Sequence, residues 1–278
     1  MQIEPFEPRD SNVLVTGSSS GIGAGLAVAL ARRGAVVGIC GRRDDRLRAV
    51  LDECRKASPR SHSWHVDLLD TGSLPEFAAD VEARFGSIDL LVNNAGVPKR
   101  RLVTRLTPAE VQDVMTINYI SPAMLTLAVL PGMVRRGHGR IVNVASTASR
   151  LGGAGETAYG ASKAALAIWT EGSAAELLSQ GIGVQLIIPG PVDTDIVNYP
   201  GEDPPLAVRA GIARLPLEEA VAVIVNHIVG TSFEAWVPPH FRDAYRQKVE
   251  DPDRSLVQAA TWIRDNLLPA KGSGPDLM

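Results

Sequence analysis

Tyr159 and Lys163 are spaced so that they could act as an acid/base pair, with Ser146 a short way upstream. The segment Tyr159-Gly-Ala-Ser-Lys163 lies in a stretch, residues 156–178, that we expect to be helical. A step of one helical turn puts both side chains on the same face. A phenol ordinarily titrates near ~10, and a neighbouring ammonium stabilises the phenolate and lowers its pKa. We therefore expect Tyr159 to exchange a proton at neutral pH, although an isolated pair of this kind is usually only a helix surface pair.

Two further polar residues could serve this pair. Ser146 ends the apolar run Arg140-Ile-Val-Asn-Val-Ala-Ser146, which predicts a strand, and open α/β sheets bind ligands outside the carboxyl ends of their strands. Asn118 lies in the helical region 108–136 although asparagine is a poor helix former. We expect either a local kink, whose freed carbonyl holds a water near Lys163, or a hydrogen-bonded core amide.

A glycine-rich loop follows the first predicted strand, residues 12–16, and precedes an alanine-rich helix. Glycines allow close backbone approach, and a helix N-terminus offers N–H groups and a favourable dipole to a pyrophosphate. A plain turn is the alternative reading. The order strand, loop, helix favours a dinucleotide site made by Gly17, Ser19, Ser20, Gly21, Ile22 and Gly23.

The second predicted strand, residues 34–41, ends in Arg42-Arg43 rather than in an acid. An Asp or Glu at this point would hold the ribose hydroxyls of NAD, whereas an arginine accommodates the 2′-phosphate of NADP. We interpret Arg42 as the phosphate clamp and Arg43 as a less certain partner, and we predict NADP(H) as the cofactor. A solvated Arg42 paired with Asp44 or Asp45 is the alternative.

Later strand ends carry further candidates. The third strand ends at His65-Val-Asp67-Leu68, where Asp67 could accept from an adenine amino group or cap the following turn. The fourth, residues 88–92, runs into Asn93-Asn-Ala-Gly96, whose small residues would let a cofactor lie against the strand end. We expect Asn93 to tie neighbouring strands together rather than touch substrate. After the sixth strand, residues 183–188, the segment Pro189-Gly-Pro-Val-Asp-Thr194 turns out of the sheet.

Composition is that of an ordinary globular α/β protein. The chain has 278 residues, 45% hydrophobic and 21% charged, and a net charge of -3, which gives no electrostatic reason for a nucleic-acid partner. Cys40 and Cys54 suggest neither a disulfide framework nor a metal site, and the histidines have no ligand-like spacing. The N-terminus is unlike a secretory signal, and no apolar run approaches the ~20 residues that cross a bilayer. We expect a cytoplasmic protein without a transmembrane segment.

In their order along the chain, these motifs resemble those of the short-chain dehydrogenase/reductase family. The resemblance covers roughly residues 10 to 237 and rests on Thr16-Gly-x-x-x-Gly-x-Gly23, Asn93-Asn-Ala-Gly96, Asn118, Ser146, Tyr159-x-x-x-Lys163 and Pro189-Gly190. It implies hydride transfer between a nicotinamide and a carbonyl or secondary alcohol. Tyr159 would be the general acid in reduction and the base in oxidation, and Ser146 would hold the substrate oxygen. Lys163 would bind the nicotinamide ribose, and Asn118 would keep the proton-relay water in place.

The same resemblance implies the remaining cofactor contacts. Val192 and Thr194 would anchor the carboxamide, and Asp67 the adenine. The other expected cofactor-binding residues are Leu68, Asn94, Ala95, Gly96, Tyr159, Lys163, Pro189 and Gly190.

Alternating strands and helices predict a single-domain Rossmann fold, a doubly wound parallel sheet with helices on both faces. We expect an N-terminal extension over 1–10, the Rossmann domain over 11–238 with a substrate loop at 191–216, and a helical tail over 239–278. The tail would place Leu256, Ala259, Ala260, Ile263 and Leu267 on one face. The family implies a homodimer through 108–136 and 156–180, and the charged tail puts a tetramer in doubt. The tail could instead cover the substrate pocket or contact a membrane surface.

The motifs together predict an NADP(H)-dependent carbonyl reductase or alcohol dehydrogenase acting on a small molecule. An apolar substrate is suggested by Leu151, Ala154, Ile196, Tyr199 and Leu206. One alternative is an NAD-dependent alcohol dehydrogenase, and another is a catalytically idle NAD(P)-binding redox sensor, which would have little need for the intact set of catalytic residues. Lys99-Arg-Arg101 could meet an anionic substrate, although a solvated loop is favoured.

Overall fold

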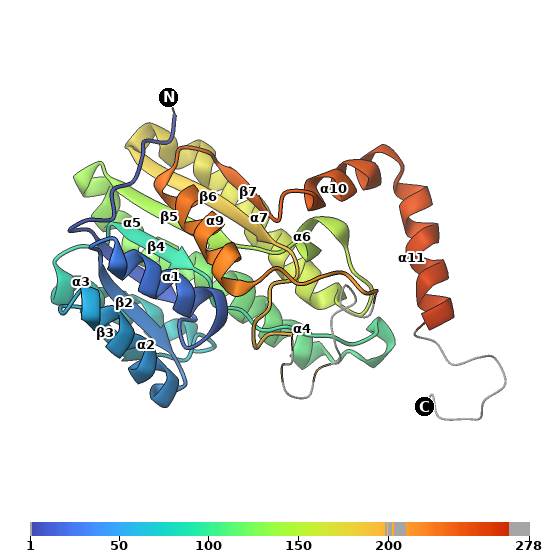
Figure 1. The fold of residues 1–278 in the computed structure, drawn as a ribbon, viewed down its shortest axis with the longest axis horizontal. Coiled ribbons are helices and arrows are strands. Elements are labelled where there is room, and N and C mark those ends of the chain that lie inside the picture. The colour runs from blue at the N-terminus through green and yellow to red at the C-terminus, as the bar shows by residue number, and fades with distance from the viewer. Residues whose placement is uncertain (1, 198, 200–201, 203–209, 267–278) are drawn as a thin grey trace.

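A seven-stranded sheet with the order β3-β2-β1-β4-β5-β6-β7 forms the centre of the computed structural model (Figure 1). Every pair of neighbouring strands is parallel, which confirms the predicted doubly wound sheet. The structure describes residues 2–197, 199, 202 and 210–266. The strands are β1 (Asn12–Thr16), β2 (Val36–Gly41), β3 (His62–His65), β4 (Leu90–Asn93), β5 (Gly139–Val144), β6 (Ile182–Pro189) and β7 (Glu234–Val237).

Helices cover both faces of this sheet, as the sequence predicts. They are α1 (Gly21–Arg32), α2 (Asp44–Ala57), α3 (Leu74–Phe85), α4 (Pro108–Met115), α5 (Ser121–Arg136), α6 (Ala148–Leu151), α7 (Thr157–Leu177), α9 (Leu217–Val229), α10 (Phe241–Glu250) and α11 (Pro252–Asn266). A π-helical turn, Thr116–Ile120, joins α4 to α5.

Successive side chains of a strand point to opposite faces of the sheet, so the buried core is divided between these two faces. Val13 and Val15 of β1 pack in one buried cluster with side chains of α1, α2 and α9. Leu14, between them, packs in a second cluster with side chains of α3, α5 and α7. The strand order reverses between β1 and β4, and ligands of such sheets bind in the crevice at this reversal, beyond the carboxyl ends.

Buried amides fix α7 against the sheet. Asn93 Nδ2 donates to Asn143 Oδ1 at 2.8 Å and to Thr126 Oγ1 at 3.1 Å, and Asn143 Nδ2 donates to Thr170 Oγ1 of α7 at 2.9 Å. This confirms that Asn93 ties neighbouring strands together. The bonds tie β4 and β5 to α5 and α7, the helix that carries Tyr159.

The described part of the tail, which was expected to be helical, forms two helices. In α10, Phe241 is buried against Gly190, and Lys248 Nζ donates to the carbonyl of Arg150 at 2.7 Å. Helix α11 has no buried residue and projects from the body in Figure 1. The predicted apolar face of the tail is therefore not packed on this chain: Leu256 is 69% exposed, and Leu267 lies outside the described residues.

The expectation that no apolar run is long enough to cross a bilayer is wrong for the helical run Pro108–Arg136. At 29 residues it is long and apolar enough to cross a membrane, because the π-helical turn joins α4 and α5 without a break. However, 56% of its most apolar window is buried within the fold, and core helices of soluble proteins meet the same criterion. The finding is therefore weak evidence for a membrane span.

Candidate active site

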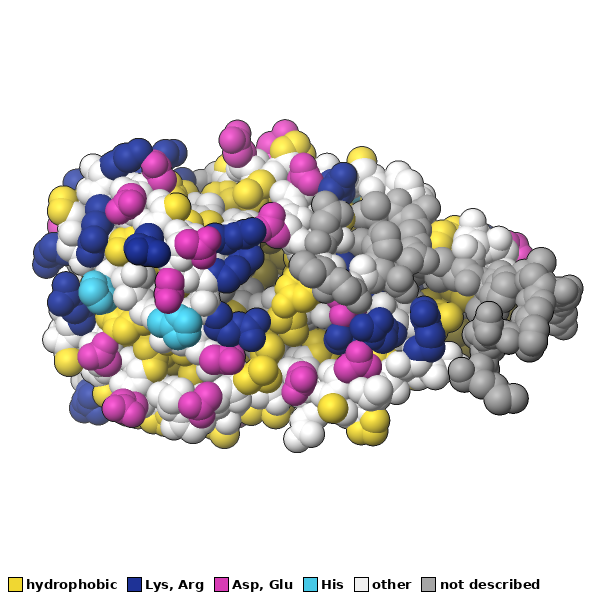
Figure 2. All heavy atoms as spheres, turned by 90° about the horizontal axis from the view of Figure 1, so that it is seen from below, with side chains coloured by type: hydrophobic (Ala, Val, Ile, Leu, Met, Phe, Trp, Pro, Cys, Tyr) yellow, Lys and Arg dark blue, Asp and Glu magenta, His cyan; other side chains and the backbone are white. Residues whose placement is uncertain are grey.

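A cavity of about 560 Å³ lies at the carboxyl edge of the sheet, between the glycine-rich loop and α7. Figure 2 looks onto this side, where lysine and arginine side chains border a hollow together with hydrophobic and acidic side chains. Of the predicted site residues, those that line the cavity are Gly17, Ser19, Ser20, Gly21, Ile22, Arg42, Asp67, Leu68, Asn94, Ala95, Gly96, Ser146, Tyr159, Lys163, Pro189, Gly190, Val192 and Thr194. Gly23 and Asn118 are not among the lining residues.

The glycine-rich loop presents the start of α1 to this cavity. Ser20 precedes the helix in extended conformation, and no side chain caps the helix there. Gly17 has a φ of +67°, and a Cβ on it would lie 2.6 Å from the Cα of Ala95. A Cβ on Gly23 would lie 2.4 Å from Nδ2 of Asn94. Both glycines are therefore required for close contact between the loop and the Asn93–Gly96 segment. Gly21 and Ile22, in the first turn of α1, line the cavity.

The two arginines after β2 make different contacts. Arg43 Nη2 donates to Ser19 Oγ at 2.7 Å and to Ser20 Oγ at 2.8 Å, so Arg43 rather than Arg42 reaches the glycine-rich loop. Arg42 lies with its Nη1 3.8 Å from Asp67 Oδ1 instead of pairing with an acid of α2. Asp67 Oδ1 also accepts from the N–H of Leu69 at 3.0 Å, which is the turn-capping alternative. Both arginines line the cavity.

Ser146, Tyr159 and Lys163 meet at the other end of the cavity. Lys163 is 3% exposed and donates through Nζ to the carbonyl of Val144 at 2.8 Å. Burial lowers the pKa of Lys163 to about 8. Burial also raises the pKa of Tyr159 to about 12, against the opposing effect of a hydrogen bond with Ser146.

The expected lowering of the Tyr159 pKa is therefore wrong for this structure. The raised pKa follows mainly from the burial of the phenol, and the Lys163 ammonium donates to the Val144 carbonyl. After burial and Ser146, the charges that act on the phenol are those of Glu156, which raises its pKa, and Arg100, which lowers it.

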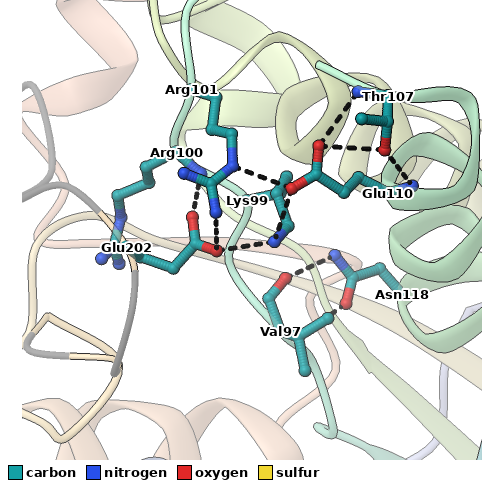
Figure 3. A network of polar contacts seen from close by, with 8 residues as sticks. All are labelled: Val97, Lys99, Arg100, Arg101, Thr107, Glu110, Asn118 and Glu202. Carbon is teal, nitrogen blue, oxygen red and sulfur yellow. Dashed lines mark hydrogen bonds and ion pairs between the residues drawn. The ribbon is translucent and has the colours of Figure 1, made fainter. Parts of the chain in front are cut away.

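Asn118 is a hydrogen-bonded core amide, the second alternative predicted for it, and it lies in a π-helical turn. Its Oδ1 accepts from the N–H of Val97 at 2.9 Å, and its Nδ2 donates to the Val97 carbonyl at 3.0 Å (Figure 3). Nδ2 also donates to Ser162 Oγ at 2.9 Å. A Cβ on Gly96 would lie 3.2 Å from both Asn118 Oδ1 and Lys163 Nζ. Asn118 thus holds the loop after β4 against α7, directly behind the cavity.

The basic segment Lys99–Arg101 is not a solvated loop, contrary to the favoured reading. Lys99 Nζ donates to Glu202 Oε1 at 2.6 Å, and Glu202 Oε2 accepts from the N–H of Arg100 at 2.6 Å (Figure 3). Arg101 Nε donates to Glu110 Oε1 at 2.8 Å. The segment therefore fastens part of the expected substrate loop to the loop after β4.

Two charged residues that the sequence did not assign to the site lie beside Tyr159. Arg100 is 5% exposed and lines the cavity, as does Glu156, with Arg100 Nε 3.4 Å from Glu156 Oε1. Arg100 Nη1 also donates to the carbonyl of Val197 at 3.2 Å. Burial raises the pKa of Glu156, opposed by Arg100. The run of three basic residues just after a strand end was the only sequence signal for this pair.

The apolar residues proposed for the substrate pocket fall into three groups. Ile196 and Tyr199 line the cavity. Leu151 packs instead against the cluster that contains Phe241, and Ala154 is not a lining residue. Leu206 lies outside the described residues. The substrate end of the cavity is therefore partly apolar and partly charged.

Within the part of the chain that the structure describes, no three His, Cys, Asp or Glu side chains are grouped to hold a metal ion. The lining residues offer other chemistry: hydroxyls, a buried ammonium, guanidinium groups and the start of a helix. These are groups suited to phosphates and to proton transfer.

The sequence of this chain is similar to a known protein family and to individual members of it. Residues 11–204 match the family model of short chain dehydrogenases. The ketoacyl reductase HetN of Nostoc is 32% identical over 223 residues, 77% of this chain and 78% of the relative. The 3-oxoacyl-[acyl-carrier-protein] reductase FabG of Escherichia coli is 33% identical over 204 residues, 73% of this chain and 81% of the relative.

Solved structures of short-chain dehydrogenases are also similar to this chain in fold. A short-chain dehydrogenase from Streptomyces avermitilis superposes with a TM-score of 0.76 at 29% identity, covering 93% of this chain and 99% of the other. A metagenomic short-chain oxidoreductase in complex with NADP superposes with a TM-score of 0.70 at 29% identity, covering 84% of this chain and 98% of the other.

Proposed function

This chain belongs to the short-chain dehydrogenase family of oxidoreductases, as its motifs predict, and from that premise we propose an NADP(H)-dependent enzyme. It would transfer a hydride between the nicotinamide and a carbonyl or secondary alcohol of a small molecule. The observation that carries the proposal is that Ser146, Tyr159 and Lys163 line the same cavity as the glycine-rich loop and the two arginines after β2. Relatives named ketoacyl and 3-oxoacyl reductases support a carbonyl as the reacting group.

The residues present fit a dinucleotide. The uncapped start of α1 would bind the pyrophosphate, and Arg42 and Arg43 would bind the 2′-phosphate. Asp67 and Leu68 would lie at the adenine, Val192 and Thr194 at the carboxamide. Small side chains at Asn93–Gly96 leave room along the strand end. When bound, the cofactor supplies the hydride.

Tyr159 would act as the general acid in reduction. With a pKa of about 12 before ligands bind, its phenol keeps its proton throughout the neutral range. The Ser146 hydroxyl, hydrogen-bonded to this phenol, would orient the carbonyl oxygen beside it. Proton transfer by a positioned group contributes about 10²- to 10⁴-fold in rate. In the oxidative direction the deprotonated phenolate of Tyr159 would accept the proton of the alcohol.

We also propose a cytoplasmic homodimer and a Rossmann domain spanning residues 11–238. Exposed apolar side chains on α5 and α7 support a second copy at this surface: Met124 is 45% exposed, Leu127 51% and Ile168 60%. Light scattering on the purified protein tests the dimer, and a monomeric mass at micromolar concentration would contradict it.

The function is tested by binding and then by turnover. We expect NADPH to bind more tightly than NADH in a fluorescence titration, and we expect NADPH to be consumed with at least one member of a panel of ketones and aldehydes. Tighter binding of NADH would overturn the NADP(H) assignment while leaving the oxidoreductase in place. Failure to bind either nucleotide would overturn the proposed function as a whole.

A further inference from the structure

The segment after β6 crosses to the other side of the cavity and contacts α2. Asp195, directly after Thr194, accepts a hydrogen bond from Nη1 of Arg46. The same Oδ2 lies 3.9 Å from Nη1 of Arg43. Arg43 in turn donates to the hydroxyls of Ser19 and Ser20 in the glycine-rich loop. A carboxylate from the far end of the sheet thus lies against the arginines at the end of β2.

The arginines at and after the end of β2 are therefore each paired with a carboxylate before any cofactor binds. Arg42 has Asp67 at 3.8 Å, and Arg43 and Arg46 share Asp195. A 2′-phosphate would bind Arg42 and Arg43, which line the cavity, because it brings about two negative charges to the end of β2. If Asp195 stays, it repels the phosphate, and if it moves away, its own attraction to the arginines is lost. Both routes weaken binding of the phosphorylated cofactor.

We propose that Asp195 is a specificity-determining residue, which competes with the cofactor 2′-phosphate for Arg43, while Arg46 holds the Asp195 carboxylate beside it. Asp195 thereby limits the preference for NADP(H) over NAD(H). The inference rests on the proposed use of NADP(H). NADH carries a hydroxyl where NADPH carries the phosphate, so the competition does not arise for it.

Asp195 can be tested without disturbing the fold. Its side chain is 59% exposed, and its described contacts are with these two arginines. Asp67 is less suitable, since its carboxylate also caps a turn at Leu69. Asp193 supplies a matched control: it is 65% exposed, pairs with Arg214 at 2.9 Å and does not line the cavity.

The experiment compares the dissociation constants of NADPH and NADH for the wild-type protein, Asp195→Asn and Asp193→Asn at low ionic strength. We expect Asp195→Asn to tighten NADPH binding about two- to fivefold, the range for exposed ion pairs, and to leave NADH binding unchanged. The gain should shrink as salt is added, because the groups are exposed. Asp193→Asn should change neither constant. In an Arg43→Gln background the gain from Asp195→Asn should be smaller.

Three results would overturn the inference. Equal tightening of NADPH and NADH binding would show that Asp195 acts on a part of the cofactor that both share. No change in either dissociation constant, or weaker NADPH binding, would contradict the competition directly. The two proposals fail separately. The wild-type ratio of the two constants tests the NADP(H) assignment, whereas the change in this ratio on Asp195→Asn tests the competition. Binding of neither nucleotide would overturn both.

Discussion

The Lys163 ammonium lies inside the fold, where burial lowers its pKa from the ordinary 10.5 to about 8. Between these two values the unfolded chain binds a proton that the folded chain does not. The free energy of unfolding therefore rises with pH across this window, because stability increases wherever the unfolded state binds more protons. The buried cation opposes stability below pH 8, where it must be held charged.

Replacing Lys163 with Met should remove this dependence. We expect the free energy of unfolding of the wild-type protein to rise relative to that of Lys163→Met by about 2 kcal/mol between pH 8 and 10. Urea denaturation at several pH values measures this difference. Tyr159 has the opposite effect, since its raised pKa makes stability fall mainly above pH 10. Parallel pH profiles for the two proteins would contradict the burial of the charged ammonium.

Residue types and spacing predicted most of the side chains that line the cavity, but they missed Arg100 and Glu156 and could not predict the electrostatics. The pKa of Tyr159 depends on burial and on the nearby charges of Glu156 and Arg100, and neither is visible in a Tyr-x-x-x-Lys motif. The sequence could not distinguish the contacts of Arg42 and Arg43 either. It shows two adjacent arginines, but the direction of the backbone after β2 decides which one reaches Ser19.

At the scale of elements, Glu202 anchors the described part of the expected substrate loop. Its side chain is 4% exposed and accepts from Lys99 and from the backbone of Arg100. The sequence could not reveal this contact because the partners are about a hundred residues apart. The bounds of helix α7 were easier to predict from the sequence, because the helical period is a local signal. A helix was predicted over 156–178, and Thr157–Leu177 is observed.

Glu202→Gln tests this anchor. Removing the charge leaves Lys99 with a weaker partner in a buried setting, so we expect the free energy of unfolding to fall by about 1–3 kcal/mol and the KM for the carbonyl substrate to rise. Chemical denaturation and steady-state kinetics measure the two effects. Glu53→Gln is the matched control, because Glu53 pairs with Lys56 on the surface and its side chain is 46% exposed. If both variants behave like the wild-type protein, Glu202 does not fasten the loop.

For the molecule as a whole, the tail divides into a packed and an unpacked helix. Helix α10 packs through Phe241 against Gly190 at the cavity floor, whereas α11 has no buried residue. No described residue of either helix lines the cavity. The sequence predicted helix in the tail from its periodicity, but an amphipathic pattern does not say whether its apolar face meets this chain.

Deleting residues 252–278 should therefore leave the melting temperature within about 2 °C of the wild-type value, because surface segments contribute little to stability. Phe241→Ala should instead cost about 3 kcal/mol, as expected for a buried phenylalanine. Thermal unfolding followed by circular dichroism compares the two. A large loss on deletion would show that α11 packs in solution, against this chain or a second copy.

The proposed chemistry joins proton transfer from Tyr159 to hydride transfer within one cavity, and isotope transfer tests this most directly. The protein is incubated with NADPH carrying deuterium at C4, on either face, and with the ketone panel. We expect deuterium from one of the two labelled forms at the carbinol carbon of the product. Tyr159→Phe should slow the reaction about 10²- to 10⁴-fold with NADPH binding retained.

Tyr245→Phe, on α10 outside the cavity, should react like the wild-type protein. Unlabelled product, the absence of product with every ketone, or full turnover by Tyr159→Phe would contradict the proposed reaction.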